Sequence, residues 1–257
     1  MSTNDLQGKT ALVTGAGRGI GAAISRSLID AGCHVILVGR TAGRLQTIET
    51  ELRDGGGRAS VCAADINDAE WLGQLVEEYK TIDIVVHAAA AFADYGPLGE
   101  CSDDEIRNVV DTNLTAAIRI AAALLPAMHE NNYGRLVFIG SRVASLGGAS
   151  QVAYAAAKGG LKALVKSLTA ETAGTNIAAH LLEPGLIDTE RTREAMSDSA
   201  RQRLAEGTAA GRPGTPEEVA TAVRYLLSPE AAFLRGVTLR VDGGMGLGLS
   251  SGHRHSS

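Results

Sequence analysis

Short apolar runs rich in β-branched residues alternate along this chain with longer segments of helical periodicity. This alternation constrains the fold more than any other feature. The runs expected to be strands are Thr10–Thr14, His34–Gly39, Ala59–Ala63, Asp83–His87, Arg135–Gly140, Ile177–Leu182 and Val237–Val241. Several are apolar almost throughout, as strands of a parallel sheet buried on both faces are. Repeated strand-helix-strand units imply right-handed crossovers, so we expect an α/β fold with one doubly wound, seven-stranded parallel sheet and helices on both faces.

The segments between the strands have the apolar spacing of helices. They are Ile20–Ala31, Arg44–Asp54, Ala69–Tyr79, Asp104–His129, Val152–Thr172 and Pro216–Leu227. Ser102 and Thr215 stand where N-caps are expected. No linker or internal repeat divides the chain, so residues 1–245 are expected to form a single domain. Residues 246–257 are expected to be a flexible tail, with a metal site at His253 and His255 as the weaker alternative; elsewhere we expect no metal.

Composition narrows the classes of partner. The chain has 257 residues, 45% of them hydrophobic, and a formal net charge of −5. A negative balance argues against nucleic acid or an anionic membrane as the main partner. Three cysteines without a Cys-x-x-Cys pair suit free thiols in a reducing compartment. No apolar stretch approaches the roughly 18 residues of a membrane span, so we expect a cytoplasmic protein that acts on a small molecule.

A glycine-rich turn from Gly15 to Gly21 joins the first expected strand to the first expected helix. Glycines there permit a tight turn and let backbone N–H groups approach a pyrophosphate at the helix N-terminus. Taken alone, such a cluster is often only a turn. The strand before it and the helix after it favour dinucleotide binding.

Tyr154 and Lys158 are four residues apart in an expected helix, so they share one face. A nearby ammonium stabilises phenolate and lowers the pKa of a phenol from its usual value of about 10. The pair is common by chance. Ser141 follows an expected strand, at the edge where such sheets bind their ligands. Asn113 lies within an expected helix although Asn has a low helix propensity.

Together these residues resemble the short-chain dehydrogenase/reductase family, over nearly the whole chain. The separation of Gly15 and Gly19 by three residues matches that family's pattern. The resemblance implies a Rossmann fold and hydride transfer with a nicotinamide cofactor. Tyr154 would exchange a proton with the substrate oxygen, Ser141 would hydrogen-bond that oxygen, and Lys158 would bind the nicotinamide ribose. Asn113 would hold a water that links Lys158 to solvent; a buried structural amide is the alternative.

The resemblance also implies the cofactor contacts. Asp65 would meet the adenine, the stretch 83–90 would line the adenosine side, and Ile187 and Thr189 would meet the carboxamide; a simple strand-ending turn at Pro184-Gly185 is the alternative. The expected contacts are Gly15, Gly17, Arg18, Gly19, Ile20, Gly21, Arg40, Asp65, Ile66, Ala89, Asn113, Tyr154, Lys158, Pro184, Gly185, Ile187 and Thr189.

The choice of dinucleotide follows from charge. NAD sites place an acid at the end of the second strand for the ribose 2′-hydroxyl. Here that position is Gly39, followed by Arg40, and Arg18 lies in the glycine turn. Two guanidinium groups at these places suit a 2′-phosphate, so NADP(H) is expected; solvated surface arginines are the alternative.

Two positions depart from the family pattern. His87-Ala88-Ala89-Ala90 stands where most relatives have Asn-Asn-Ala-Gly. We expect His87 to be a braced core histidine rather than a catalytic or metal-binding one. Arg142 follows Ser141, where it would either meet an acidic substrate group or pair with Glu183 or Asp188. We favour the pairing.

The closing segments, Gly211–Glu218 and Val241–Gly244, resemble those of 3-oxoacyl-acyl-carrier-protein reductases. We therefore expect NADPH-dependent reduction of a ketone. A sugar or sugar-acid dehydrogenase, a ketoreductase of secondary metabolism and a catalytically silent dinucleotide sensor are the alternatives. Residues from about 188 to 211 are polar and irregular, which favours a substrate lid over a fixed surface excursion. The resemblance implies a homotetramer, or a homodimer, paired through the two longest helices.

Overall fold

The computed structural model describes residues 5–68, 70–93 and 96–247. Its strands pair in parallel in the order β3-β2-β1-β4-β5-β6-β7. They are β1 (Thr10–Thr14), β2 (His34–Gly39), β3 (Arg58–Ala63), β4 (Ile84–His87), β5 (Gly134–Ile139), β6 (Ile177–Pro184) and β7 (Thr238–Val241). The predicted α/β fold with a seven-stranded parallel sheet of the Rossmann type is confirmed.

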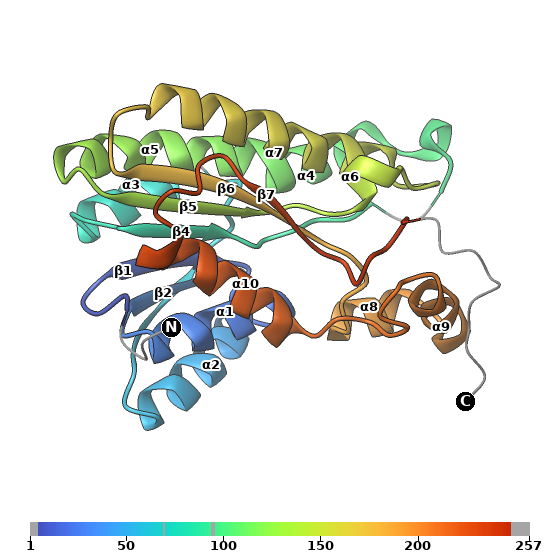
Figure 1. The fold of residues 1–257 in the computed structure, drawn as a ribbon, viewed down its shortest axis with the longest axis horizontal. Helices are drawn as coiled ribbons and strands as arrows, with labels where there is room; N and C mark the ends of the chain where they lie inside the picture. The colour runs from blue at the N-terminus through green and yellow to red at the C-terminus, as the bar shows by residue number, and fades with distance from the viewer. Residues whose placement is uncertain (1–4, 69, 94–95, 248–257) are drawn as a thin grey trace.

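Helices fill the connections between the strands (Figure 1). They are α1 (Gly19–Asp30), α2 (Ala42–Asp54), α3 (Glu70–Glu78), α4 (Asp103–Val110), α5 (Ala116–Glu130), α6 (Val143–Leu146), α7 (Val152–Glu171), α8 (Glu190–Ala195), α9 (Asp198–Glu206) and α10 (Pro216–Leu227). Two short 3₁₀ turns are η1 (Leu98–Glu100) and η3 (Pro229–Ala231). The capping boxes expected at Ser102 and Thr215 are formed with Glu105 and Glu218.

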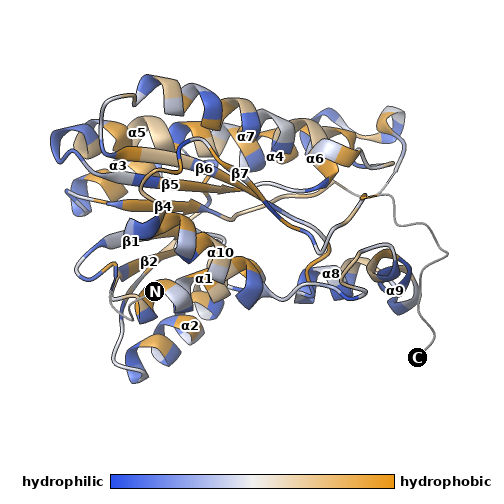
Figure 2. Cartoon of the chain, in the orientation of Figure 1, coloured by the Kyte–Doolittle hydropathy of each residue, from blue (hydrophilic) through white to orange (hydrophobic). Residues whose placement is uncertain are grey.

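The helices form a layer on each face of the sheet. Helices α1, α2 and α10 pack on one face, and α3, α5 and α7 pack on the other (Figure 1). Because strand side chains alternate between faces, Ala11 and Val13 of β1 enter the first core and Leu12 enters the second. Figure 2 shows the consequence as apolar strands between helices with polar outer surfaces. The sheet is therefore buried on both sides.

The expected continuous helix Asp104–His129 is interrupted, which corrects the prediction. A π-helical turn, η2 (Asp111–Thr115), lies between α4 and α5. Within the described part of the chain, the stretch Asp103–Glu130 is the one helix that by length and composition could cross a membrane, with a mean hydropathy of 1.3 and half of that window buried. Ile120, Leu124 and Met128 enter the second core, so it is a core helix of this fold.

The segment from about 188 to 211 contains α8 and α9, so the expectation of an irregular backbone is wrong. Its role as a substrate lid stays a prediction. Each helix begins at a hydroxyl cap, Thr189 and Ser197 respectively. The cysteines Cys33, Cys62 and Cys101 are free thiols, as predicted. Most of the expected tail, including His253 and His255, lies outside the described residues.

Candidate active site

A cavity of about 1230 Å³ opens at the carboxyl ends of the strands. Its walls come from the turns after β1, β2 and β4, from the ends of β5 and β6, and from α8 and α9. Pockets for small ligands usually measure roughly 300–1,000 Å³. The space therefore suits a ligand as long as a dinucleotide together with a second molecule, at the edge where parallel sheets bind their ligands.

The glycine turn forms one end of this cavity. Gly15 has a φ of +70°, and a Cβ on it would lie 2.8 Å from the backbone of Ala89. A Cβ on Gly21 would lie 2.2 Å from the carbonyl oxygen of Gly15. Neither position accepts a side chain. Helix α1 begins at Gly19 without a side-chain cap, which leaves its first N–H groups directed at the cavity end where an anion would be held.

Three arginines line this same end. Arg40 and Arg44 are exposed and make no ion pair within the described residues. Arg18 donates two hydrogen bonds, at 3.0 and 3.1 Å, to the carboxylate of Glu194 in α8. Arg44 was missed by the sequence prediction; its place in the first turn of α2, just beyond Arg40, was the available signal.

Three expected cofactor contacts, Asp65, Ile66 and Asn113, are not among the residues that line the cavity. Asp65 is exposed and accepts a hydrogen bond from the backbone N–H of Asn67 at 2.9 Å. Ile66 is 7% exposed and belongs to the second core. By contrast, the expected contacts that line the cavity are Gly15, Gly17, Arg18, Gly19, Ile20, Gly21, Arg40, Ala89, Tyr154, Lys158, Pro184, Gly185, Ile187 and Thr189.

The structure places Ser141, Tyr154 and Lys158 around the other end of the cavity. Tyr154 and Lys158 are on consecutive turns of α7, and the Lys158 Nζ lies 5.6 Å from the centroid of the Tyr154 ring. The Nζ donates a hydrogen bond to the carbonyl oxygen of Ile139 at 2.8 Å. Burial lowers the pKa of Lys158 to about 7. Ser141 follows β5, and its hydroxyl oxygen accepts a hydrogen bond from the Val143 N–H at 3.2 Å.

Asn113 lies behind the cavity, fully buried in the π-helical turn. Its Nδ2 donates to the carbonyl oxygens of Ala91 at 2.7 Å and Val109 at 2.9 Å. Its Oδ1 is buried without a hydrogen-bond partner in the part of the chain that is described. An unsatisfied buried acceptor beside the wall formed by Ala91 fits an ordered water.

His87 is fully buried and held at both ring nitrogens. Its Nε2 lies 3.1 Å from the carbonyl oxygen of Thr112, and its Nδ1 lies 3.1 Å from the hydroxyl of Thr14. The Thr14 hydroxyl oxygen in turn accepts the Ala89 N–H. Because a carbonyl only accepts, we assign the proton to Nε2, and burial lowers the pKa of the ring to about 3. The predicted braced histidine is present.

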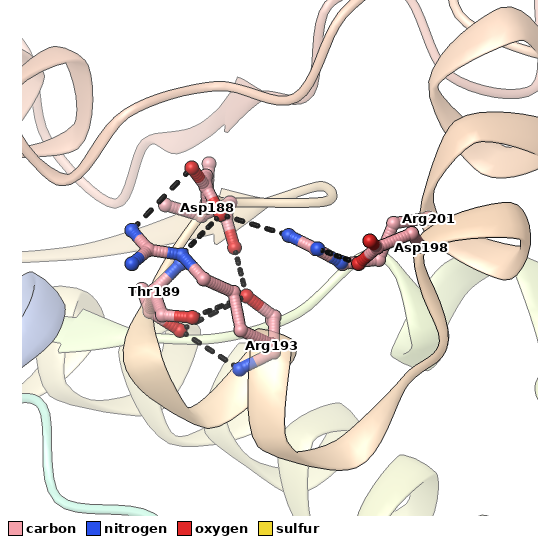
Figure 3. A network of polar contacts seen from close by, with 7 residues as sticks. Asp188, Thr189, Arg193, Asp198 and Arg201 are labelled. Carbon is pink, nitrogen blue, oxygen red and sulfur yellow. Dashed lines mark hydrogen bonds and ion pairs between the residues drawn. The ribbon is translucent and has the colours of Figure 1, made fainter.

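Arg142 forms the buried pairing that the sequence favoured, but with only one of the two proposed acids. It lies 3.6 Å from Glu183 and 2.6 Å from Asp242, and it donates to the carbonyl oxygen of Met245 at 3.3 Å. Pairing with Asp188 is wrong. Asp188 instead binds arginines of α8 and α9 (Figure 3).

Besides Arg44, the sequence prediction missed Phe92 and Arg191. The ring of Phe92 stacks on the ring of Tyr154, with centroids 4.7 Å apart and planes inclined by 27°. The guanidinium of Arg191 lies 5.0 Å from the centroid of Phe92. Both line the cavity. The only signal was the position of Phe92 just beyond the stretch in which the chain departs from the family pattern.

Comparison with known proteins agrees with this geometry. A family model described as enoyl-(acyl carrier protein) reductase matches residues 15–246. A 3-oxoacyl-[acyl-carrier-protein] reductase of Vibrio harveyi is 38% identical over 242 residues, covering 94% of this chain and 98% of the relative. The chain belongs to the short-chain dehydrogenase/reductase family. It is therefore an oxidoreductase of that family.

Solved structures of short-chain dehydrogenases match equally well. A putative gluconate dehydrogenase from Agrobacterium tumefaciens has a TM-score of 0.90 at 30% identity, covering 95% of this chain and 98% of that one. A putative NAD(P)-dependent gluconate 5-dehydrogenase from Beutenbergia cavernae, with bound NADP, has a TM-score of 0.88 at 37% identity and the same coverage. This oxidoreductase is thus related both to acyl-carrier-protein reductases and to gluconate dehydrogenases.

Proposed function

We propose that this oxidoreductase uses NADPH to reduce a ketone to a secondary alcohol. One observation carries the proposal: Ser141, Tyr154 and Lys158 line the same cavity as the glycine turn and the arginines beside it. Such a cavity holds a dinucleotide at one end and a proton donor at the other. The four family residues Asn113, Ser141, Tyr154 and Lys158 are all present, and a silent sensor would have no need of the full set.

The residues of the cavity fit a phosphorylated dinucleotide. The glycine turn is tight because a Cβ on Gly15 or Gly21 would meet backbone atoms, and the uncapped first turn of α1 offers N–H groups to a pyrophosphate. Arg40 and Arg44 are available for a 2′-phosphate, and Lys158 for ribose hydroxyls, as the resemblance implies. The dinucleotide supplies the hydride when it is bound. The bound NADP in the Beutenbergia cavernae relative supports the choice of NADPH.

In the proposed mechanism the chain's own side chains orient the carbonyl and deliver the proton. Tyr154 donates its phenolic proton to the carbonyl oxygen, and the Ser141 hydroxyl hydrogen-bonds the same oxygen as negative charge develops there. The buried amine of Lys158, when protonated, stabilises the phenolate that remains on Tyr154. The unsatisfied Oδ1 of Asn113 supports a water that returns a proton to this pair from solvent.

Oxidation of a sugar-acid hydroxyl is a second candidate. The resemblance to two putative gluconate dehydrogenases favours it, at 30% and 37% identity. It uses the same residues in the reverse direction, with Tyr154 as the base.

The decisive experiment compares wild-type enzyme with Tyr154→Phe across 3-oxoacyl thioesters, polyketide-like ketones, keto sugars and sugar acids, following NADPH absorbance. We expect wild-type reduction of at least one ketone class and a loss of about 10²–10⁴-fold in kcat/KM for Tyr154→Phe. NADPH binding, measured by fluorescence titration, is expected to persist in the variant. Tight NADPH binding with no turnover of any compound by wild type would instead support the sensor.

A further inference from the structure

Helices α8 and α9 carry four arginines, and these fall into two pairs. Arg193 and Arg201 are both bound to Asp188, with nitrogen–oxygen distances of 2.9 and 3.3 Å, and Arg201 also bonds Asp198. Figure 3 shows this network, in which the two guanidinium groups converge on one acid. The charge of this first pair is therefore compensated by Asp188 and Asp198.

Arg191 and Arg203, the second pair, differ from the first pair in their position and in their lack of an ion pair among the described residues. They line the cavity, and neither makes a hydrogen bond or an ion pair with any residue that the structure describes. The acids of α8 are placed elsewhere. Glu194 is bound to Arg18, and Glu190 lies beside the glycine turn, where a Cβ on Gly19 would be 3.7 Å from its Oε2. Among the described residues that line the cavity Glu190 is the one acid, and neither guanidinium forms an ion pair with it.

The position of Arg191 connects it to the reacting end of the cavity. Phe92 contacts both the guanidinium of Arg191 and the ring of Tyr154, so one aromatic ring separates the cation from the proton donor. Arg18 in the glycine turn, with Arg40 and Arg44 after β2, are the cations that the cofactor's phosphates would use. A guanidinium in a confined, uncompensated site attracts carboxylate or phosphate strongly and can bind it in a bidentate manner.

We propose that Arg191 and Arg203 hold an anionic group of the substrate. The compound that this enzyme reduces is then a carboxylate- or phosphate-bearing ketone with the anion a few bonds from the carbonyl. The inference rests on the proposed function and adds to it the substrate class and the two residues that select it.

Matched pairs of ketones that differ in charge test the proposal. Acetoacetate is compared with methyl acetoacetate, and dihydroxyacetone phosphate with dihydroxyacetone, by the ratio of kcat/KM within each pair. We expect a preference for the charged member in one pair, which identifies the anion as carboxylate or phosphate. Arg191→Gln and Arg203→Gln should each lower that ratio about 10- to 100-fold, as expected for the loss of one charge-assisted hydrogen bond.

Arg193→Gln is the matched control, because Arg193 lies on the same helix with its charge already bound by Asp188. It should leave the ratio unchanged. If wild type shows the same kcat/KM for the charged and the neutral member of both pairs, the inference is overturned. A loss of preference in Arg193→Gln as large as in Arg191→Gln would also overturn it. A rise in the KM for NADPH in Arg191→Gln, without any change in the ratio, would assign the guanidinium to the cofactor and also overturn it.

Failure of the inference and failure of the proposed function give different results. Reduction of the neutral ketones alone supports the function and contradicts the anion site. If no ketone is reduced, calorimetric titration of the NADPH-loaded enzyme with acetoacetate and with dihydroxyacetone phosphate tests the site without turnover. Binding of one of them that is weakened in Arg191→Gln and retained in Arg193→Gln would support the site; no binding would overturn it.

Discussion

At the scale of single residues, His87 stands at the end of β4, where the family pattern has an amide side chain. Its imidazole ring makes both of its hydrogen bonds only when it is neutral. One nitrogen donates to the Thr112 carbonyl and the other accepts from the Thr14 hydroxyl. The π-helical turn makes the first contact possible. There the Ala116 N–H bonds the Asp111 carbonyl, so the Thr112 carbonyl is left without its usual helical partner. His87 thereby ties the helix that carries Asn113 to the strand end beside the cofactor cavity.

This histidine makes stability depend on pH. Its folded-state pKa of about 3 lies below the ordinary histidine pKa of 6.5, so between these values the unfolded chain binds a proton that the folded chain does not. Its contribution to stability is complete above pH 6.5 and is lost as the pH falls toward 3. The slope is about 1.4 kcal/mol per pH unit at most. His87→Asn should remove this part of the pH dependence and lower the slope, while His180, whose pKa burial lowers to about 4, keeps its own part.

Urea unfolding at several pH values between 4 and 7.5 measures the effect. The control is His129→Gln, on the exposed end of α5, which should retain the wild-type slope. An unchanged slope in His87→Asn would contradict the assignment of a neutral, buried ring.

At the scale of elements, the sequence predicted those features that depend on the spacing of residues close together in the chain. The strands, the glycine turn and the Tyr154–Lys158 pair follow from patterns a few residues long, and the structure places them as expected. The π-helical turn was invisible because one extra residue in a turn leaves the apolar spacing of its neighbours almost intact. Helices α8 and α9 are too short and too polar to show helical periodicity.

Partners that are distant in sequence were harder to predict. Arg142 had two plausible acids within fifty residues, but the acid nearest to it is Asp242, a hundred residues away. Phe92 and Arg191 meet only because the turn after β4 and helix α8 approach the same end of α7. The contact of Asp65 with adenine stays a prediction from the resemblance; in the structure the Asp65 carboxylate accepts a hydrogen bond from the Asn67 N–H.

The Arg142 contacts join the ends of three strands beside Ser141. Arg142 follows β5, Glu183 lies in β6, and Asp242 follows β7. All three side chains are at most 10% exposed. Arg142→Met should leave two acids without their cation and cost about 3–5 kcal/mol, as broken buried ion pairs do. Glu183→Gln should cost less, because Asp242 is the closer partner.

Thermal unfolding measures this prediction directly. For a chain of this size each kcal/mol lowers Tm by roughly 2–4 °C. An equal loss of Tm in Arg142→Met and Glu183→Gln would show that the network is not centred on the guanidinium.

At the scale of the whole molecule, the net charge of −5 conceals a strongly basic cavity. Its charged lining consists of one acid, Glu190, and the basic residues Arg18, Arg40, Arg44, Arg142, Lys158, Arg191 and Arg203. The overall charge balance could not show that the positive charges of these side chains gather in one place. Such a gathering draws small anions into the cavity from solution.

Cofactor choice belongs to this scale because it depends on the field of several arginines. Arg40→Asp should raise the KM for NADPH about 10- to 100-fold, since a charge-assisted contact is replaced by repulsion. The KM for NADH should fall, because a carboxylate can accept hydrogen bonds from the ribose 2′-hydroxyl. Steady-state kinetics with both cofactors measures the switch. Unchanged preference would contradict the NADPH assignment; Arg53→Gln, on the far end of α2, is the control.

The bond between Arg18 and Glu194 joins the glycine turn to helix α8. If a 2′-phosphate binds Arg18, it competes with Glu194 for that guanidinium, and cofactor binding then includes the free energy of breaking this ion pair. The two events are then thermodynamically linked, and linkage is reciprocal. A compound that binds Arg191 and so favours the Arg18–Glu194 bond would then lower the affinity for NADPH. NADPH would lower the affinity for that compound by the same factor. Cofactor and substrate would then bind this enzyme with negative cooperativity.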